Sequence, residues 1–333
     1  MSAKTASHRP STGSAGRRPL GRTGLSVSPV GLGTWAIGGG GWEFGWGPQD
    51  DRSSRATIGR ALEVGINWID TAPAYGTGHA EEVVGEALRG RAARPHLFTK
   101  VSLRWDDHRK ITHDLRPESI RAEVAESRRR LGVEPLDLVQ VHWPEPDAGI
   151  EDGWRALAEL KDQGSVRHIG VSNFSVAQME RVGAIAPVET LQPPYSLVQP
   201  EVETEILPYA RQHGIGVIVY SPMGCGLLTG AVTPERVARM PPDDWRRRNP
   251  EFREPRLSRH RALATLLAEI GSAHGGRSAA EVAIAWTLAN PAVTGAIVGA
   301  RSPEQVDGFG GALNLRLTPG ELTSIEEFRA AHP

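Results

Sequence analysis

The sequence predicts an α/β protein folded as one (β/α)8 barrel, and three observations point to this class. Short, nearly continuous apolar runs recur along the chain, which is typical of strands buried on both faces. Amphipathic helical segments that end in glycine separate these runs. No Gly/Ser-rich linker divides the chain, so eight strand–helix units are expected to close into a single TIM barrel.

A β-hairpin is expected before the first barrel strand, because residues 18–30 (RPLGRTGLSVSPV) alternate around a central glycine. Eight apolar runs follow as predicted strands, at residues 30–34, 66–70, 96–100, 137–143, 168–172, 190–193, 216–221 and 296–299. The long interval between the seventh and eighth runs holds a Pro/Arg-rich loop and two further helices. Extra helices are expected after the eighth strand.

Glycine closes four predicted helices, at residues 56–65, 117–132, 153–164 and 202–214, because the left-handed conformation after a helix favours it. Pro117 suits the first turn of its helix, on which Ile120, Val124 and Leu131 recur at helical spacing. Pro208 lies inside the last of these segments and predicts a kink there.

The first strand carries a misleading motif. GLGTWA, residues 31–36, fits the dinucleotide-binding pattern G-x-G-x-x-G/A, and Asp51 lies about 20 residues further on, as its acidic partner should. That pattern requires a helix to open at once, but the glycine-rich segment IGGGGWEFGWG follows. A Rossmann domain is therefore not expected, and the strand count also disagrees with a doubly wound sheet.

The bulk properties exclude several classes of protein. The 333 residues carry a net charge of −1, which gives no general attraction to nucleic acid or to an anionic membrane. Cys225 is the only cysteine, so disulfides and thiolate metal clusters are excluded, and no apolar run is long enough to span a membrane. Residues 1–17 lack the apolar segment of a secretory signal and predict a disordered tail before a single domain of residues 18–333. A cytoplasmic location is expected, no metal site is expected, and the oligomeric state stays open.

Polar side chains end six successive predicted strands. Active sites of (β/α)8 barrels form at the C-terminal ends of the strands. The residues found there are Asp70, Lys100, His142, Ser172 with Asn173, Gln192 and Tyr220, and Tyr75 follows just after the second strand. Caps and turns alone do not explain six such ends in succession, so a functional mouth is expected on this face.

Lys100 is the most informative of these residues. Only four of the 38 basic residues are lysines, and the other three fall in the tail, a loop and an exposed helix face. A lysine ammonium is compact and its pKa can be tuned, which arginine does not offer. Taken singly, Lys100 also fits a strand-end cation that reaches water, and His142 also fits a hydrogen-bonded core histidine.

Together, four residues predict acid catalysis at a carbonyl oxygen. Asp70 keeps Lys100 charged and directs it, and the ammonium is expected to lower the pKa of the Tyr75 phenol from about 10. His142 orients the carbonyl or helps to relay the proton. A carbonyl protonated on oxygen also needs a hydride on carbon, which no side chain supplies, so a nicotinamide cofactor is implied.

Other strand ends suit that cofactor. Ser172, Asn173 and Gln192 offer the donors and acceptors that a carboxamide needs, and Tyr220 offers a flat face for the nicotinamide ring. After the eighth strand a helix is expected to open at Pro303, and Arg301 precedes it as a candidate phosphate ligand.

The motifs resemble those of the aldo-keto reductase superfamily over nearly the whole chain. The matching segments are GLGTWAIGG, IDTAPAYG, LFTK, LVQVHWP, IGVSNF, LQPPYSL, YSPMGCGLLTG and IVGARSPEQV. The long interval after the seventh strand is similar to the bacterial, plant and channel-subunit branch. The resemblance implies that NADPH is bound without a Rossmann domain and that an aldehyde or ketone is reduced to an alcohol. It also implies a catalytic tetrad of Asp70, Tyr75, Lys100 and His142.

The resemblance further implies a cofactor site. Ser172, Asn173, Gln192 and Tyr220 match the nicotinamide end. The segment that wraps the pyrophosphate contains Ser221, Met223, Gly224, Gly226 and Leu227, and the adenosine and 2′-phosphate end contains Gly299, Arg301, Ser302 and Gln305. Trp35 is counted with the cofactor residues.

Two departures from the family pattern affect the distal end of the cofactor. Phe309 stands where relatives often carry an asparagine for the adenine, which leaves stacking by Phe309 as an alternative. The segment GCGLL lacks a basic residue that some relatives have, so the phosphate charge falls to Arg301 and to the Arg-rich loop at residues 236–248.

Aromatic residues suggest the walls of a substrate pocket. They crowd the first loop and follow two of the polar strand ends: Trp35, Trp42, Phe44, Trp46, Trp105 and Trp143. Trp42, Trp105 and Trp143 are the candidates for substrate contact. A small-molecule aldehyde or ketone on an apolar or aromatic body fits such walls, and sugars also stack on tryptophan.

Three other classes of protein compete with this interpretation. A metal-dependent barrel hydrolase needs a histidine pair at the end of the first strand, and VGLGTW has none. A Schiff-base aldolase needs a lysine late in the barrel, but none follows Lys161. A nucleotide-sensing binding subunit with the same fold and little turnover stays open, because such proteins can retain the tetrad.

Overall fold

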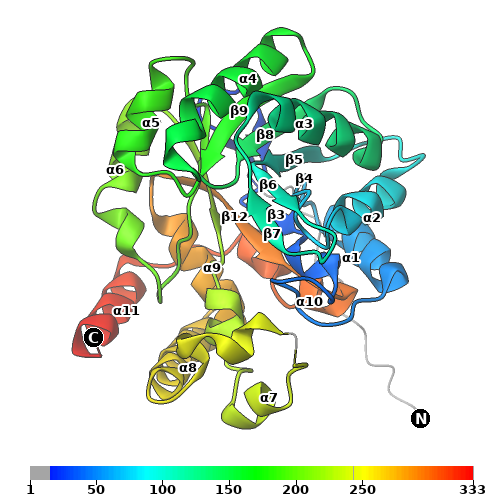
Figure 1. Cartoon of the computed structure of the whole chain (residues 1–333). Helices are drawn as coiled ribbons and strands as arrows, with labels where there is room; N and C mark the ends of the chain where they lie inside the picture. Colours follow the sequence, from blue (N-terminus) through cyan, green and yellow to red (C-terminus); the bar gives the residue numbers. More distant parts are fainter. Residues whose placement is uncertain (1–15, 243, 333) are drawn as a thin grey trace.

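The computed structural model describes residues 16–242 and 244–332, and in these ranges eight parallel strands close a barrel (Figure 1). Around the barrel the strands follow the order β10, β11, β12, β3, β4, β5, β8 and β9. Their bounds are β3 Val30–Gly33, β4 Trp68–Asp70, β5 His96–Val101, β8 Leu136–Val141, β9 Val166–Ser172, β10 Thr190–Gln192, β11 Gly216–Tyr220 and β12 Val293–Gly299. The predicted fold class is confirmed, with strand ends that differ from the predicted ones by a few residues.

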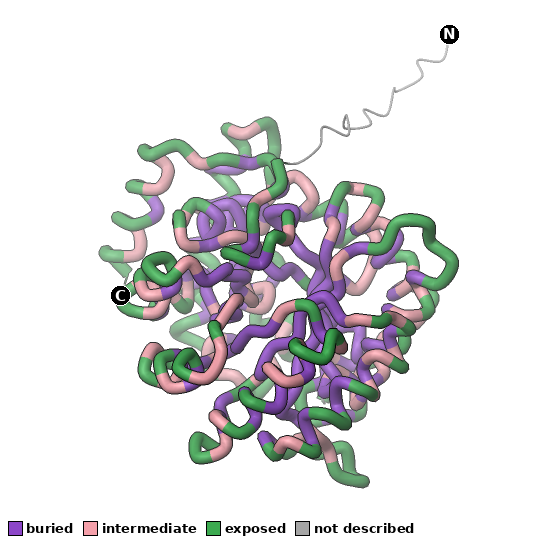
Figure 2. The backbone as a smooth tube through the Cα atoms, turned by 90° about the horizontal axis from the view of Figure 1, so that it is seen from above, coloured by how far each residue is buried: buried purple, intermediate pink, exposed green. Residues whose placement is uncertain are grey.

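Helices surround the barrel, and the buried backbone gathers at the centre of the molecule while the exposed backbone forms its rim (Figure 2). The helices between successive barrel strands are α1 Asp51–Glu63, α2 His79–Leu88, α3 Pro117–Leu131, α4 Ile150–Asp162, α5 Val176–Gly183 and α6 Ile206–His213. Gly132 and Gly214 cap α3 and α6 in the left-handed conformation, as predicted. Pro208 lies in the first turn of α6, so the predicted kink is wrong: the helix begins only at Ile206, and proline fits a first turn.

The predicted long interval after the seventh strand carries α7 Pro234–Ala238, α8 Arg256–Ala273 and α9 Ala279–Ala289, with short 3-10 turns between them. The C-terminal part adds α10 Pro303–Asp307 and α11 Pro319–Ala331. The predicted tail lies almost wholly outside the described residues. No helix of the described residues is long and apolar enough to cross a membrane.

The predicted N-terminal hairpin is present, as β1 Arg18–Pro19 paired antiparallel with β2 Ser26–Val27. Leu20 and Val27 of this hairpin are fully buried against the apolar layer inside the barrel. That layer contains Trp68, Phe98, Leu138, Ile218 and Ile297. The hairpin therefore closes the N-terminal end of the barrel and leaves the C-terminal end as the accessible mouth.

The alternation of a β-strand explains why polar residues collect at that mouth. Trp68, Phe98 and Leu138 point into the barrel, and the next residue along each strand points outward. Ile69 and Val139 pack into the main core, and Thr99 donates to Glu81 of α2. The residues two positions further on, Asp70, Lys100 and Gln140, therefore point inward again, one layer nearer the mouth. Gly31 makes room for the first layer, because a Cβ there would lie 2.2 Å from the indole of Trp68.

A second hairpin was not anticipated from the sequence. It consists of β6 Leu103–Trp105 and β7 Ile111–His113, which pair antiparallel directly after β5 (Figure 1). Arg109 at its tip donates to the backbone oxygen of Gly76 at 2.8 Å, and the Ile111 amide donates to the carboxylate of Glu43 at 3.2 Å. The hairpin is thereby tied to the loop that follows β4 and to the first loop of the barrel.

Candidate active site

The three N–H donors of Lys100 all have partners at the mouth. Nζ donates to Asp70 Oδ1 at 2.6 Å, to the backbone oxygen of Thr71 at 2.9 Å and to Tyr75 Oη at 3.3 Å. Asp70 and Lys100 are the last inward-facing residues of the adjacent strands β4 and β5, so the barrel itself sets their separation. Because the ammonium can only donate, the phenol of Tyr75 accepts this bond and keeps its own hydrogen for another acceptor.

Burial and mutual attraction act against each other in the Asp70–Lys100 pair. Lys100 is 0% and Asp70 2% exposed. Burial raises the pKa of Asp70 and lowers the pKa of Lys100, and the attraction between the two groups opposes both shifts. The short contact favours a hydrogen-bonded ion pair, and so do the bond that Lys100 donates to the Thr71 oxygen and the bond that Asp70 accepts from Gln192.

The expected lowering of the Tyr75 pKa is not what the structure gives. Burial, with the negative charge of Asp70 second, raises the pKa of Tyr75 well above 10. The phenol is therefore protonated at neutral pH, which is the form that a general acid needs. The geometry places a hydrogen bond and a positive charge from Lys100 beside the phenol oxygen, where they stabilise a tyrosinate relative to an unassisted one.

His142 packs edge-on against the ring of Tyr75, with 5.9 Å between the ring centroids. Burial lowers the pKa of His142 well below its usual value, and Lys100 lowers it further. The imidazole is thus neutral at pH 7. Its Nδ1 is a buried atom without a hydrogen-bond partner among the described residues, so the ring has unused capacity at the mouth.

This geometry predicts that kcat for the carbonyl reduction implied by the resemblance changes little with pH. With cofactor and substrate saturating, kcat is expected to change less than about threefold between pH 5.5 and 8.5, because neither His142 nor Tyr75 titrates near the usual histidine pKa of about 6.5. Steady-state rates in a constant-ionic-strength buffer series test this. A limb near pH 6.5 that disappears in His142→Gln contradicts it.

The predicted nicotinamide residues form one connected group. Ser172 Oγ donates to the backbone oxygen of Gln192 at 2.7 Å, and Asn173 Nδ2 donates to the backbone oxygen of His142 at 2.9 Å. Tyr220 Oη donates to Asn173 Oδ1 at 2.8 Å, which holds the phenol ring at the end of β11. The side chains of Ser172, Asn173 and Tyr220 thus link the ends of β8, β9, β10 and β11 at the mouth.

Gln192 is bound more deeply than expected. Its Nε2 donates to Asp70 Oδ2 and to Gln140 Oε1, each at 2.8 Å. In the described part of the chain its Oε1 accepts no hydrogen bond, and this oxygen is not among the fully buried unpartnered atoms. A free acceptor at the mouth fits a carboxamide N–H of a nicotinamide. Gln140, which sequence reasoning missed, reads there only as a polar interruption of an apolar strand.

The segment predicted to wrap the pyrophosphate has an unusual backbone. Ser221, Gly224, Cys225 and Gly226 all have φ between +53° and +102°. Non-glycine residues rarely adopt this region, and such strain often accompanies a ligand-binding loop. Leu227 is buried against Phe252 and Leu257, and Met223 packs against the main core, so these two side chains anchor the loop. Only their backbone groups remain for a phosphate.

Arg301 lies in the turn between β12 and α10, as predicted, but three of its donors already have partners. Its guanidinium donates to Gln49 Oε1 at 2.8 Å, to the backbone oxygen of Trp46 at 3.2 Å and to the backbone oxygen of Pro48. A guanidinium has five N–H groups, so two have no partner among residues 16–242 and 244–332 and can meet a phosphate. Burial lowers the pKa of Arg301, and the nearby guanidinium of Arg246, itself paired with Asp244 at 2.6 Å, lowers it further.

The other residues of this end lie around the same turn. Gln305 Oε1 accepts from the Arg301 amide at 2.8 Å, Ser302 is the N-cap residue of α10, and Gly299 ends β12. Phe309 is 3% exposed and belongs to the main core. The alternative that Phe309 stacks on the adenine is therefore wrong, because its ring is enclosed by apolar side chains.

An aromatic stack covers Tyr75 at the mouth. Trp35 lies parallel to the Tyr75 ring at 6.4 Å on one side and to Trp245 at 5.5 Å on the other. Trp46 meets both indoles edge-on, and the Arg246 guanidinium lies 4.3 Å from the centroid of the Trp46 ring. Sequence reasoning missed Trp245, because it lies in the Pro/Arg-rich loop, far from any strand end.

The three candidate substrate residues have different surroundings. Trp42 is buried and contacts the rings of Tyr75 and Phe44. Trp143 is 37% exposed beside His142, and Phe44 is 42% exposed. Trp105 lies on the second hairpin with Arg104 over its ring, and no ring contact to Tyr75 or His142 is found among the described residues. Trp42 and Trp143 thus border the tetrad more closely than Trp105.

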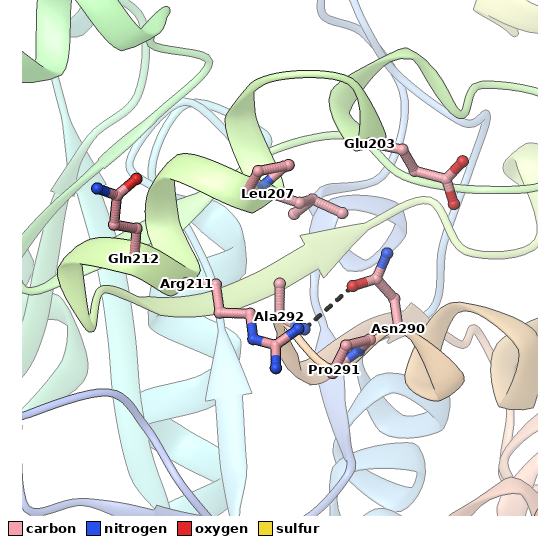
Figure 3. A pocket seen from close by; sticks show the side chains of 8 residues that line it. Glu203, Leu207, Arg211, Gln212, Asn290, Pro291 and Ala292 are labelled. Carbon is pink, nitrogen blue, oxygen red and sulfur yellow. Dashed lines mark hydrogen bonds between the residues drawn. The ribbon is translucent and has the colours of Figure 1, made fainter.

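A separate groove of about 490 Å³ lies on the flank of the barrel (Figure 3). Residues of α6 and of the turn between α9 and β12 line it, and the side chains of Arg211 and Asn290 point toward each other across it. None of the predicted site residues belongs to this groove. It is therefore distinct from the mouth.

A barrel whose mouth holds a protonated phenol on a buried ammonium, beside a neutral imidazole, defines an oxidoreductase that acts on carbonyl groups. The chain belongs to the aldo/keto reductase family, whose model matches residues 29–330. Members of this class reduce carbonyl compounds with a nicotinamide cofactor.

Similar proteins cover nearly the whole chain. Aldo-keto reductase YhdN of Bacillus subtilis (strain 168) is 41% identical over 287 residues, covering 86% of this chain and 85% of that protein. The NADH-specific methylglyoxal reductase of Escherichia coli (strain K12) is 34% identical, covering 94% of this chain and 98% of that protein.

Solved structures show the same similarity. Glycerol dehydrogenase AKR11B4 from Gluconobacter oxydans superimposes with a TM-score of 0.86 at 39% identity, covering 96% of each chain. The holo form of aldo-keto reductase AKR11C1 from Bacillus halodurans gives a TM-score of 0.77 at 28% identity, covering 94% of this chain and 95% of that chain.

Proposed function

We propose that this protein reduces an aldehyde or ketone to an alcohol with NADPH, and that Tyr75 supplies the proton to the carbonyl oxygen. The observation that carries the proposal is the bond from Lys100 Nζ to Tyr75 Oη at 3.3 Å, at the mouth of the barrel. A bound nicotinamide supplies the hydride to the carbonyl carbon. Residues 18–333 are proposed to act as one domain.

Each residue of the tetrad then has a separate task. Tyr75 donates its proton to the carbonyl oxygen as negative charge develops there. Lys100 stabilises the tyrosinate that forms, and Asp70 holds Lys100 in place. His142, neutral and beside the phenol ring, offers a hydrogen bond that orients the carbonyl. The aromatic rings of Trp42 and Trp35 exclude water from one side of the phenol.

A turnover assay tests this function directly. Purified protein is mixed with NADPH and a panel that includes 4-nitrobenzaldehyde, methylglyoxal and simple ketones, and absorbance at 340 nm is followed. Steady consumption of NADPH with at least one carbonyl supports the proposal. Tight NADPH binding with no turnover across the panel contradicts it and identifies the protein as a nucleotide-binding subunit.

We propose NADPH rather than NADH because the guanidinium of Arg301 lies at the turn after β12 and has no carboxylate partner among the described residues. Two N–H groups of Arg301 have no partner in the described part of the chain, and Arg246, paired with Asp244, lies nearby. NADPH differs from NADH by one phosphate, and a hydrogen bond to a charged group contributes roughly 1.5–3 kcal/mol, or about 10- to 150-fold in affinity. The E. coli relative that is named NADH-specific makes this choice worth testing directly.

Replacing Arg301 by Ala is expected to weaken NADPH binding at least about tenfold and to change NADH binding by less than about threefold. Fluorescence titration of both cofactors measures this, and higher salt is expected to weaken NADPH binding more than NADH binding.

Gln49→Leu is the matched control for Arg301→Ala. It removes the bond that ties the guanidinium to the first loop but keeps the charge, so it is expected to affect both cofactors alike. Equal losses for NADPH and NADH in Arg301→Ala contradict a role of Arg301 at the 2′-phosphate.

A further inference from the structure

A row of buried amides leads from the inside of the barrel to the carboxylate of Asp70. Gln140 is 0% exposed on β8, and its Cα pairs in register with that of Lys100 on β5. Gln140 Oε1 accepts from Gln192 Nε2 at 2.8 Å, and Gln192 Nε2 also donates to Asp70 Oδ2 at 2.8 Å. Gln140 thus contacts none of the reacting groups itself but lies one residue removed from the Asp70–Lys100 pair.

The direction of this row is fixed at both ends. Gln140 Nε2 faces the backbone oxygen of Val171 at 3.4 Å and Thr190 Oγ1 at 3.2 Å, and a carbonyl oxygen can only accept. Gln140 must therefore turn its own oxygen toward Gln192. At the other end the carboxylate of Asp70 accepts as well, so Gln192 must present its Nε2 to both neighbours.

The orientation of the Gln192 amide decides which of its atoms is left for a ligand. Both hydrogens of Nε2 have acceptors, so Oε1 is the group without a partner among the described residues, and it is an acceptor rather than a donor. If the amide of Gln192 turned over, Oε1 would face the carboxylate of Asp70 and the oxygen of Gln140, and both contacts would become repulsive. Gln140 and Asp70 together thus exclude the wrong orientation.

We propose that Gln140 is a positioning residue, which holds the Gln192 amide so that Oε1 accepts from the carboxamide of the nicotinamide while Nε2 holds Asp70 toward Lys100. This inference rests on the proposed function, because it assumes that a nicotinamide binds at the mouth. Gln140, inside β8, thereby links recognition of the cofactor to the alignment of Asp70 with Lys100.

Binding of two dinucleotides tests the proposal without turnover. NADP+ carries a carboxamide, whereas 3-acetylpyridine adenine dinucleotide phosphate carries an acetyl group that has no N–H to donate. The wild-type protein is expected to bind NADP+ about two- to tenfold more tightly, which is the usual range for one hydrogen bond. In Gln140→Met the preference is expected to fall to less than half of the wild-type ratio, because an unheld amide no longer presents one defined acceptor.

The kinetic readout separates positioning from general packing. Gln140→Met is expected to lower kcat about tenfold with the KM for the carbonyl substrate within about twofold, because Asp70 loses alignment while the substrate pocket is unchanged. Leu138→Val is the matched control, since Leu138 points into the barrel from the same strand but makes no polar contact. It is expected to lower the melting temperature and to keep both the binding preference and kcat.

The outcomes distinguish the two proposals. If wild-type protein binds neither dinucleotide, the proposed function fails and this inference fails with it. If wild-type protein prefers NADP+ and Gln140→Met retains that preference, the positioning role is wrong while the proposed function stands. The same conclusion follows if Leu138→Val loses the preference as much as Gln140→Met does. Equal binding of the two dinucleotides by wild-type protein also overturns the positioning role of Gln140. Circular dichroism verifies folding, and Gln140→Leu is a second apolar replacement if Gln140→Met does not fold.

Discussion

Tyr75→Phe is expected to lower kcat for carbonyl reduction at least about 100-fold while NADPH binding stays within about twofold of wild type. General acid catalysis contributes about 10²- to 10⁴-fold, and phenylalanine removes only the hydroxyl that donates the proton. The ring contacts of Tyr75 with Trp35, Trp42 and His142 survive the change, so the aromatic wall should keep its shape.

Single-turnover reduction of 4-nitrobenzaldehyde, followed at 340 nm, measures the chemical step for this variant. Tyr209→Phe is a suitable control, because it removes a phenol hydroxyl on α6, outside the mouth. Retention of more than a tenth of the wild-type rate, with chemistry limiting, removes Tyr75 from the role of acid.

Lys100→Met is expected to lower kcat by about 10²- to 10³-fold, the range seen when one donor to a developing oxyanion is removed. Methionine fills similar space but leaves the tyrosinate without its hydrogen bond and positive charge. Removing one partner of a buried pair typically destabilises a protein by about 3–5 kcal/mol. The raised pKa of Asp70 reduces that penalty here, because the buried carboxyl can take up a proton instead of staying charged.

The double variant Lys100→Met/Asp70→Asn separates folding from catalysis, since it leaves no unpaired charge inside the barrel. Both variants are expected to be folded by circular dichroism and to reduce carbonyls at least about 100-fold more slowly than wild type. Normal turnover in a folded Lys100→Met protein contradicts the proposed coupling of Lys100 to Tyr75.

Much of the fold could be predicted from residue order alone, because each element carries a local signal. The change from apolar residues to Asp70 predicts the end of one strand, and Gly132 predicts the end of one helix. The second hairpin could not be anticipated in this way. Its strands are only three residues long and partly exposed, so they show no apolar run, and their partners Gly76 and Glu43 lie far away in the chain.

Some residues of the candidate site could be predicted from the sequence and others could not. Tetrad positions could be identified because parallel strands in a barrel bring their C-terminal ends to one face, whatever the side chains are. Trp245 and Gln140 escaped notice, since one comes from a long loop and the other lies inside a strand. The Arg301 guanidinium is bound by carbonyl oxygens of the first loop, a contact that no motif encodes.

The sequence by itself determined the barrel, the face on which the polar strand ends meet, and which phenol, ammonium and imidazole lie there. It did not determine their protonation. The pKa of Tyr75 was expected to fall because a cation is near, but the tertiary structure raises it, because complete burial and the charge of Asp70 outweigh that cation. The spacing of residues along a strand is local, so it can be taken from the sequence. Desolvation of a group depends on all the side chains that pack around it, and these side chains come from all parts of the chain.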